Sequence, residues 1–141
     1  MCFTLSRISY IFNVTIFRFR RSNNPILFFS NNSDILIVAD TLAKIYALDL
    51  KTGKILWKTP VGYEKTLNDE KPIGTSIFGG TALNSGGVLF VTGTHDNLVY
   101  GINSYTGKII WEYEMNAAGS APPTLFSHKG NQYLVVVSTG G

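Results

Sequence analysis

The sequence predicts an all-β protein, and two observations point to that class. The first is an internal repeat, in which Ile45–Trp57 aligns with Val99–Trp111 without a gap, 54 positions apart. Six of the thirteen aligned residues are identical. The second is that short apolar runs alternate with turns that contain Gly. A repeat of about 40 to 50 residues with this content is typical of β-propellers, whose blades are four-stranded antiparallel sheets. We therefore expect a partial β-propeller.

Each copy of the repeat is predicted to be a β-hairpin. Gly53 and Gly107 stand in the connection between two β-rich runs, where a tight turn needs a residue that tolerates positive φ. Asp49 and Asn103 precede the Thr of each turn by three residues, so their side chains can accept hydrogen bonds from the turn's amides or from the Thr hydroxyl. The two turns are thus specified by local sequence.

The tryptophans of the repeat are predicted to be core residues without a chemical role. Trp57 and Trp111 each follow the turn Gly by four residues. Ala47 and Gly101 are small at matching places, as if each indole needed a shallow seat on a neighbouring sheet. Both indoles are expected to be largely buried.

The order of apolar runs predicts one complete blade flanked by two incomplete ones within residues 34–141. The predicted strands are Ile35–Val38, Ile45–Leu50, Ile55–Thr59, Phe78–Leu83, Val88–Thr92, Leu98–Asn103, Lys108–Glu114, Pro123–Phe126 and Tyr133–Val137. They make three strands of a first blade, a full second blade over 76–115, and two strands of a third. The last of them is a strong β-former that would aggregate as an unpaired edge, so the chain is expected to be a fragment.

Residues 1–33 are left unassigned because they do not resemble the repeats. The apolar run Ile8–Phe17 has ten residues, contains Asn13 and is too short to span a bilayer. As a secretory signal it has its charges, Arg18–Arg21, on the wrong side and lacks a small-residue cleavage site. A membrane or targeting role, additional strands, and a segment foreign to the native fold stay open.

Composition excludes few classes of function. The 141 residues suffice for a core but not for a closed propeller with this period. A net charge of +3 gives no argument for nucleic acid, and the lone Cys2 cannot form an internal disulfide. His95 and His128 are single histidines in predicted turns, where solvation is the simpler interpretation than metal binding. The common hydrolase, zinc and P-loop motifs are missing from the sequence.

At this point the motifs resemble a known family. The signature Ala47-x-Asp49-x-x-Thr52-Gly53-x-x-x-Trp57 is similar to the tryptophan-docking repeat of the quinoprotein propellers. An ordered series of motifs resembles the C-terminal blades of dehydrogenases that depend on pyrroloquinoline quinone (PQQ), of the membrane-bound glucose dehydrogenase type. The series comprises Pro60–Gly62, Gly74–Thr75, Gly79–Gly80, Gly86–Val91, Asp96–Asn97, Ala117–Gly119, Pro122–Thr124, Gly130–Val136 and Gly140–Gly141. It extends from about Ile35 to the end of the chain.

The resemblance implies an eight-bladed propeller that holds PQQ near its axis with Ca²⁺ or Mg²⁺. It also implies oxidation of a sugar or alcohol, electron transfer to a quinone or cytochrome, and a periplasmic location, with attachment to the inner membrane left open. The residues carried over as cofactor-binding are Phe78, Gly79, Gly80, Asp96 and Asn97. The Gly pair would let backbone amides approach the anionic cofactor, and Asp96 would orient the quinone or a basic partner. An ordinary Asx turn is the alternative for Asp96. We expect Asp96 and the Gly pair to lie at one edge of the sheets.

The departures from the family pattern limit what the chain is expected to do. Ser76-Ile77-Phe78 stands where the family often has Asn or Trp, and the His that follows the terminal Gly pair is missing after Gly141. The resemblance assigns no catalytic residue to this chain and places the metal ligands outside it. The chain alone is therefore expected to be inactive.

A second hypothesis is a non-catalytic propeller, similar to the lipoprotein scaffold of outer-membrane protein assembly. That scaffold shares the Thr-Gly and Trp repeat. The series from Ala117 to Val136 favours the dehydrogenases over the scaffold.

Overall fold

The computed structural model describes residues 5–11, 14–19, 35–39, 44–63, 73–75, 77 and 79–139. Within these ranges the regular elements are β-strands and no helix is present, so no helix there could cross a membrane. The strands are β1 (Leu5–Ile11), β2 (Val14–Phe19), β3 (Ile35–Ala39), β4 (Lys44–Asp49), β5 (Ile55–Pro60), β6 (Gly80–Leu83), β7 (Val88–Thr92), β8 (Leu98–Asn103), β9 (Ile109–Glu114), β10 (Thr124–His128) and β11 (Asn131–Val137).

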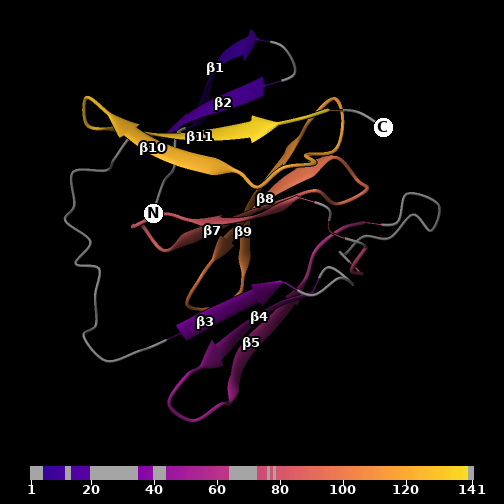
Figure 1. Cartoon of the computed structure of the whole chain (residues 1–141), viewed down its shortest axis with the longest axis vertical. Coiled ribbons are helices and arrows are strands. Elements are labelled where there is room, and N and C mark those ends of the chain that lie inside the picture. The colour runs from indigo at the N-terminus through magenta and orange to yellow at the C-terminus, as the bar shows by residue number, and fades with distance from the viewer. Residues whose placement is uncertain are drawn as a thin grey trace.

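The strands form three antiparallel sheets that are stacked one above another (Figure 1). Sheet A has the order β1-β2-β11-β10, sheet B the order β3-β4-β5, and sheet C the order β6-β7-β8-β9. Sheet C lies in the middle of the stack, between sheet A at the top of Figure 1 and sheet B at the bottom. The all-β, antiparallel architecture predicted from the repeat is confirmed.

All nine predicted strands are present; β7 and β8 have their predicted bounds, and the ends of the others differ from the prediction by one or two residues. Strand β6 begins at Gly80 rather than at Phe78, since Gly79 is a bend; Phe78 itself lies outside the described residues. Strands β10 and β11 extend closer to each other than expected and leave a two-residue turn. Both turn residues, Lys129 and Gly130, have positive φ (48° and 75°), as the tightest hairpin turns require.

The N-terminal strands complete sheet A, for which only two strands were predicted from the sequence. Strand β2 pairs with β11 along its whole length, from Gln132↔Phe19 to Val137↔Val14, and β1 pairs with β2. Part of the unassigned segment 1–33 is therefore the outer half of a four-stranded sheet. Additional strands were one of the alternatives left open for this segment. Their pairing with β11 was not predicted, because the partners come from opposite ends of the chain.

Two apolar layers separate the three sheets. One lies between sheets C and A and contains Val88, Phe90, Val99, Met115, Leu134 and Val136. The other lies between sheets B and C and contains Ile45, Val61, Leu89, Val91, Tyr100 and Ile102. Because successive residues of a strand point to opposite faces, β7 contributes alternately to the two layers, and all five of its residues are buried.

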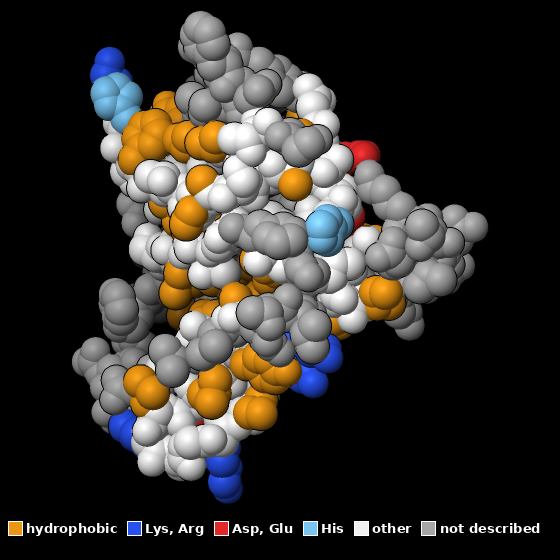
Figure 2. All heavy atoms as spheres, turned by 45° about the vertical axis from the view of Figure 1, so that its right-hand side comes forward, with side chains coloured by type: hydrophobic (Ala, Val, Ile, Leu, Met, Phe, Trp, Pro, Cys, Tyr) orange, Lys and Arg blue, Asp and Glu red, His pale blue; other side chains and the backbone are white. Residues whose placement is uncertain are grey.

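Sheet B presents apolar side chains to solvent. Leu50, Ile55 and Leu56 are 58%, 59% and 51% exposed. Figure 2 shows hydrophobic side chains at the surface in the lower part of the molecule, the height at which sheet B lies in Figure 1. Sheet C is covered on both faces by sheets A and B, whereas no described residue covers these apolar side chains of sheet B.

The two copies of the repeat form equivalent hairpins. Each has a register shift after the small residue that lies opposite the Trp, in the pairs Ala47↔Trp57 and Gly101↔Trp111. Gly53 and Gly107, with φ of 68° and 71°, close the turns as predicted.

Asp49 and Asn103 act as predicted in these turns. The side chain of Asp49 accepts hydrogen bonds from the Lys51 amide (2.9 Å) and the Thr52 hydroxyl (2.9 Å), and these bonds lower its pKa from the usual value. Asn103 Oδ1 accepts from the Tyr105 amide at 2.9 Å and the Thr106 amide at 3.1 Å.

The tryptophans are partly buried, which corrects the expectation that both are largely buried. Each lies on the outermost strand of its sheet, β5 or β9, where one side of the indole remains close to solvent. Trp57 reaches the next sheet, since its Nε1 donates to the Ser104 carbonyl at 2.9 Å. Trp111 packs edge-on to Phe90 and stacks on Tyr113.

Candidate functional site

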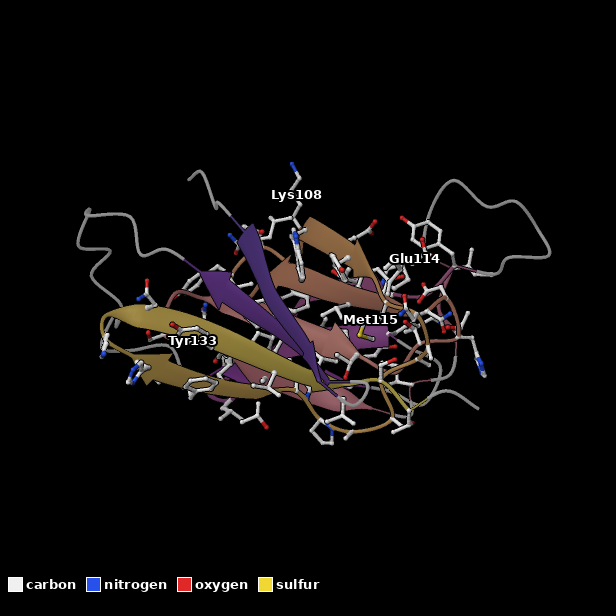
Figure 3. The ribbon with its side chains drawn as sticks, turned by 90° about the horizontal axis from the view of Figure 1, so that it is seen from above. Lys108, Glu114, Met115 and Tyr133 are labelled. Carbon is white, nitrogen blue, oxygen red and sulfur yellow. The ribbon has the colours of Figure 1, made fainter. Side chains whose placement is uncertain are left out.

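The predicted cofactor residues that the structure describes lie at one end of sheet C. Gly80 pairs with Thr92, the last residue of β7, and the loop 93–97 leads from there into β8. Gly79, Gly80, Asp96 and Asn97 therefore lie at the same edge, as expected. We call this end of the sheets, with residues 61–63, 79–80, 93–97 and 115–123, the glycine edge. Figure 3 labels Lys108 and Glu114 near opposite ends of β9; Met115, which follows Glu114, marks the glycine edge.

Three glycines bring backbone segments into direct contact at this edge. A Cβ on Gly79 would lie 2.6 Å from the Thr92 carbonyl oxygen and 2.7 Å from that of Gly119. A Cβ on Gly93, whose φ is +92°, would lie 2.0 Å from the Gly79 nitrogen. Protein backbone thus occupies the space that a side chain at Gly79 would take. Close packing of three chain segments is a sufficient reason for glycine there.

The side chain of Asp96 is buried and fully hydrogen-bonded. It is 3% exposed. Its Oδ1 accepts from the Thr94 hydroxyl at 2.5 Å and from the Leu98 amide at 3.0 Å, the second contact being the Asx-turn geometry considered above. Its Oδ2 accepts from the Tyr63 amide at 2.8 Å and from the Tyr100 hydroxyl. Both oxygens are therefore directed into the protein.

Two tyrosines connect this carboxylate to its surroundings. The Tyr100 hydroxyl donates to Asp96 and accepts from the Gly62 amide at 3.0 Å. Burial, and then the hydrogen bond to Asp96, raise the pKa of Tyr100 above its usual value of 10.0. Burial, followed by the nearby Glu112 carboxylate, likewise raises the pKa of Tyr63, whose hydroxyl donates to Glu112 Oε1 at 3.2 Å. Both phenols are therefore neutral hydrogen-bond donors near neutral pH.

Sequence reasoning missed Tyr63 and Tyr100 as members of this cluster. The repeat does align Tyr100 with Tyr46, but the loop that holds Asp96 has five residues between β7 and β8, whereas four residues separate β3 from β4. The difference appears only with the strand bounds of the structure, so it was not a usable signal at the level of sequence.

Asn97 has a side chain that is available for a ligand. Its φ is +65°, a conformation that Asn tolerates better than most residues. Its backbone oxygen accepts from the Met115 amide at 2.9 Å. Its side chain is partly exposed and makes no hydrogen bond to any described residue.

The glycine edge fits one wall of a cofactor site and lacks the charge partners. Its described residues include no Lys or Arg that could pair with the carboxylates of PQQ. Among the described residues of the whole chain, no group of three or more His, Cys, Asp or Glu side chains could hold a metal ion. Apart from His95 and the internally hydrogen-bonded Asp96, the edge provides backbone and uncharged hydrogen-bonding groups. Binding through it would need cationic groups from elsewhere.

Stacked antiparallel sheets with a Trp reaching from one sheet to the turn of the next define this chain as blades of a β-propeller. Comparison with known proteins agrees. Residues 20–134 match the family model described as PQQ, glucose/ethanol/alcohol dehydrogenase, beta-propeller domain. The chain belongs to this family of PQQ-dependent dehydrogenase propellers.

Individual relatives show the same membership. The chain is 34% identical over 104 residues to the glycerol dehydrogenase large subunit of Gluconobacter oxydans, covering 68% of this chain and 14% of that protein. It is 36% identical over 107 residues to the quinoprotein glucose dehydrogenase of Escherichia coli, covering 69% of this chain and 13% of that protein. The chain thus spans about one seventh of the length of these relatives.

Solved structures show the propeller fold. A europium-containing methanol dehydrogenase superposes with a TM-score of 0.54 at 14% identity, covering 99% of this chain and 22% of that one. BamB from Moraxella catarrhalis superposes with a TM-score of 0.52 at 18% identity, covering 97% of this chain and 41% of that one. Because the two similarities are alike, fold alone does not distinguish a dehydrogenase from a protein such as BamB.

Proposed function

We propose that this chain forms blades of a PQQ-dependent dehydrogenase that oxidises a sugar or alcohol and passes the electrons to a quinone or cytochrome. The observation that carries the proposal is the family match over residues 20–134. The relatives named glycerol dehydrogenase and quinoprotein glucose dehydrogenase support the substrate class. A periplasmic location, with or without attachment to the inner membrane, belongs to the same proposal.

The glycine edge is the side of these blades that we assign to the cofactor. Asn97 offers a side-chain amide, and Gly79 and Gly80 offer backbone groups. Phe78 stays a predicted cofactor contact that lies outside the described residues. Asp96 contributes by fixing the loop that presents Asn97, because both of its oxygens have partners inside the protein. Bound PQQ would supply the redox chemistry, with Ca²⁺ or Mg²⁺ held by residues beyond this chain.

These contacts are too few to hold PQQ tightly. The described residues of the edge include no Lys or Arg. Uncharged groups that face open water gain little from an anionic ligand, about 1 kcal/mol each or less. We therefore expect this chain alone to bind PQQ weakly and not to oxidise sugars.

An NMR titration of the isotopically labelled chain with PQQ and Ca²⁺ tests the assignment. We expect weak, saturable shifts confined to amides of residues 79–80, 93–97 and 115–121. Citrate, a tricarboxylate without a quinone, controls for charge. Asn97→Gly keeps the positive φ and should weaken the shifts, whereas Lys129→Gly, the other described non-Gly residue with positive φ, lies at the opposite end of the sheets and should not.

The outcomes separate the hypotheses. Shifts at the opposite end, in turns 50–53 and 104–107, would remove the cofactor assignment. Micromolar binding with dye reduction by glucose would show a complete small enzyme. No response to PQQ at any concentration would favour the alternative of a non-catalytic propeller scaffold.

A further inference from the structure

The segment that leaves β5 is attached to sheet C by side chains rather than by strand pairing. The Gly62 amide donates to the Tyr100 hydroxyl at 3.0 Å, and the Tyr63 amide donates to Asp96 Oδ2 at 2.8 Å. Gly62 is buried, and so are Tyr100 and Asp96. Two consecutive amides at the exit of sheet B are therefore satisfied only by a tyrosine and an aspartate of the next sheet.

The Tyr100 hydroxyl connects the segment after β5 to the 93–97 loop. It accepts from Gly62 and donates to Asp96, and Asp96 in turn accepts from Thr94 within the 93–97 loop and from Leu98, the first residue of β8. Loss of the hydroxyl would leave the buried Gly62 amide without an acceptor, which costs more than an exposed hydrogen bond. The 93–97 loop is thus attached to residues 62–63 in two ways: directly, through the Tyr63 amide and Asp96, and through the Tyr100 hydroxyl, which contacts both Gly62 and Asp96.

The first copy of the repeat shows that packing alone does not require this contact. Tyr46 pairs with Val38 as Tyr100 pairs with Val91, so the two tyrosines occupy equivalent positions. Tyr46 is only partly buried, lies beneath the Lys58 ammonium group at 5.3 Å, and makes no hydroxyl hydrogen bond to a described residue. The repeat therefore contains the same residue with and without the hydrogen-bonded cluster.

We propose that Tyr100 is a positioning residue, whose hydroxyl, through Asp96, sets the placement of the 93–97 loop against residues 62–63 and so the shape of the glycine edge. The consequence for PQQ rests on the function proposed above. The placement itself does not, and it can be measured in the absence of cofactor.

Amide hydrogen exchange of the intact chain tests the placement. In Tyr100→Phe we expect the Gly62 amide to exchange about tenfold faster or more, since its acceptor is gone, while amides inside β7 keep their protection. Tyr46→Phe, the matched control, should change neither. Unchanged exchange at Gly62 in Tyr100→Phe would overturn the proposal. An equal rise at Gly62 and in β7 would also overturn it, because it would indicate general destabilisation.

Asp96→Asn provides a second variant should Tyr100→Phe fail to fold. The amide side chain retains one oxygen, so it can still accept from either Leu98 or Tyr63 but presents an NH₂ group to the other. We expect faster exchange at only one of these two amides, together with a shifted Asn97 resonance. Normal protection of both amides and an unmoved Asn97 would contradict the proposed coupling.

The effect of Tyr100 on PQQ binding is measured separately from its effect on the loop. If the wild-type chain shows PQQ-induced shifts at the glycine edge, Tyr100→Phe should raise their Kd about fivefold, the equivalent of one hydrogen bond, and Tyr46→Phe should not. An unchanged Kd would confine Tyr100 to a structural role and refute positioning of the cofactor wall. Absence of shifts in the wild type would count against the proposed function, and the exchange measurements would still decide whether Tyr100 places the loop.

Discussion

Gly53 and Gly107 occupy equivalent positions in the turns of the two repeat hairpins, yet they have different neighbours. Both have left-handed φ angles, 68° and 71°. A Cβ on Gly53 would meet nothing within 4 Å, whereas a Cβ on Gly107 would lie 2.7 Å from the Trp57 ring and from the Thr59 hydroxyl. The Trp57 indole therefore packs against Gly107 of the neighbouring sheet. Gly101, which was expected to take this role, instead lies opposite Trp111 within its own sheet.

This difference predicts unequal costs for the same substitution. Gly53→Ala should lower the free energy of unfolding by about 1–2 kcal/mol, the cost of a left-handed conformation with a Cβ. Gly107→Ala should cost at least about 2 kcal/mol more, because Trp57 must also move. Urea denaturation measures both. Equal costs would show that Trp57 does not pack on this turn in solution.

The raised pKa of Tyr100 predicts that the free energy of unfolding falls at alkaline pH. Its pKa is raised in the folded state, while in the unfolded chain it ionises near pH 10.0. Below pH 10 both states keep the proton and the contribution of Tyr100 is complete. Above pH 10 the unfolded state loses its proton first, so the free energy of unfolding should fall by about 1.4 kcal/mol per pH unit.

Denaturation measured between pH 9 and 11.5 would test this. Tyr100→Phe should show a shallower decline than the wild type, and Tyr46→Phe should retain the wild-type slope. Identical slopes for wild type and Tyr100→Phe would mean that the Tyr100 phenol is reachable by solvent in the folded state.

At the scale of elements, two side chains of β5 join sheet B to the turn that follows β8. Trp57 donates to the Ser104 carbonyl at 2.9 Å, and the Thr59 hydroxyl donates to the Gly107 carbonyl at 2.5 Å. Both acceptors are backbone groups of the next hairpin. Adjacent sheets are thus connected by polar contacts at the turns as well as by the apolar layer.

Thr59→Val isolates one of these contacts. The substitution keeps the shape of the side chain and removes its hydrogen bond, so we expect a loss of about 1 kcal/mol in the free energy of unfolding. Thr124→Val is the control, because Thr124 is exposed on edge strand β10 and makes no side-chain hydrogen bond to a described residue. A cost as small as that of the control would argue against this link between the sheets.

At the scale of the whole molecule, sheet A joins the two ends of the chain. Strand β2 covers the edge of β11, an apolar strand that would otherwise expose unpaired amides and carbonyls. Deletion of residues 1–33 should therefore leave an edge that pairs with other molecules. We expect the truncated chain to self-associate in size-exclusion chromatography with light scattering, while the full chain does not through this edge.

A rescue variant tests the cause. Val135→Lys places a charge on β11 between the buried residues Leu134 and Val136, and charged side chains oppose edge-to-edge pairing. It should reduce association of the truncated chain. A truncated chain that stays monomeric and as stable as the full chain would show that β1 and β2 are not needed in sheet A.

The sequence by itself determined the features that depend on neighbouring residues. The turns at Asp49–Gly53 and Asn103–Gly107 follow from short polar side chains and from Gly at a positive φ, and the structure shows those hydrogen bonds. Strands β7 and β8 have their predicted bounds because apolar runs between turn residues leave little choice of conformation. The common edge of Gly79, Gly80 and Asp96 follows from strand direction alone.

Only the tertiary structure decided which distant groups meet. The pairing of β2 with β11 brings together residues from the two ends of the chain. The four donors around Asp96 include Tyr63 from the segment after sheet B, so its burial is invisible in the local motif Asp96–Asn97. Hydrogen-bond partners between sheets depend on how the sheets stack, and stacking is set by the packing of the whole core rather than by any short stretch of sequence.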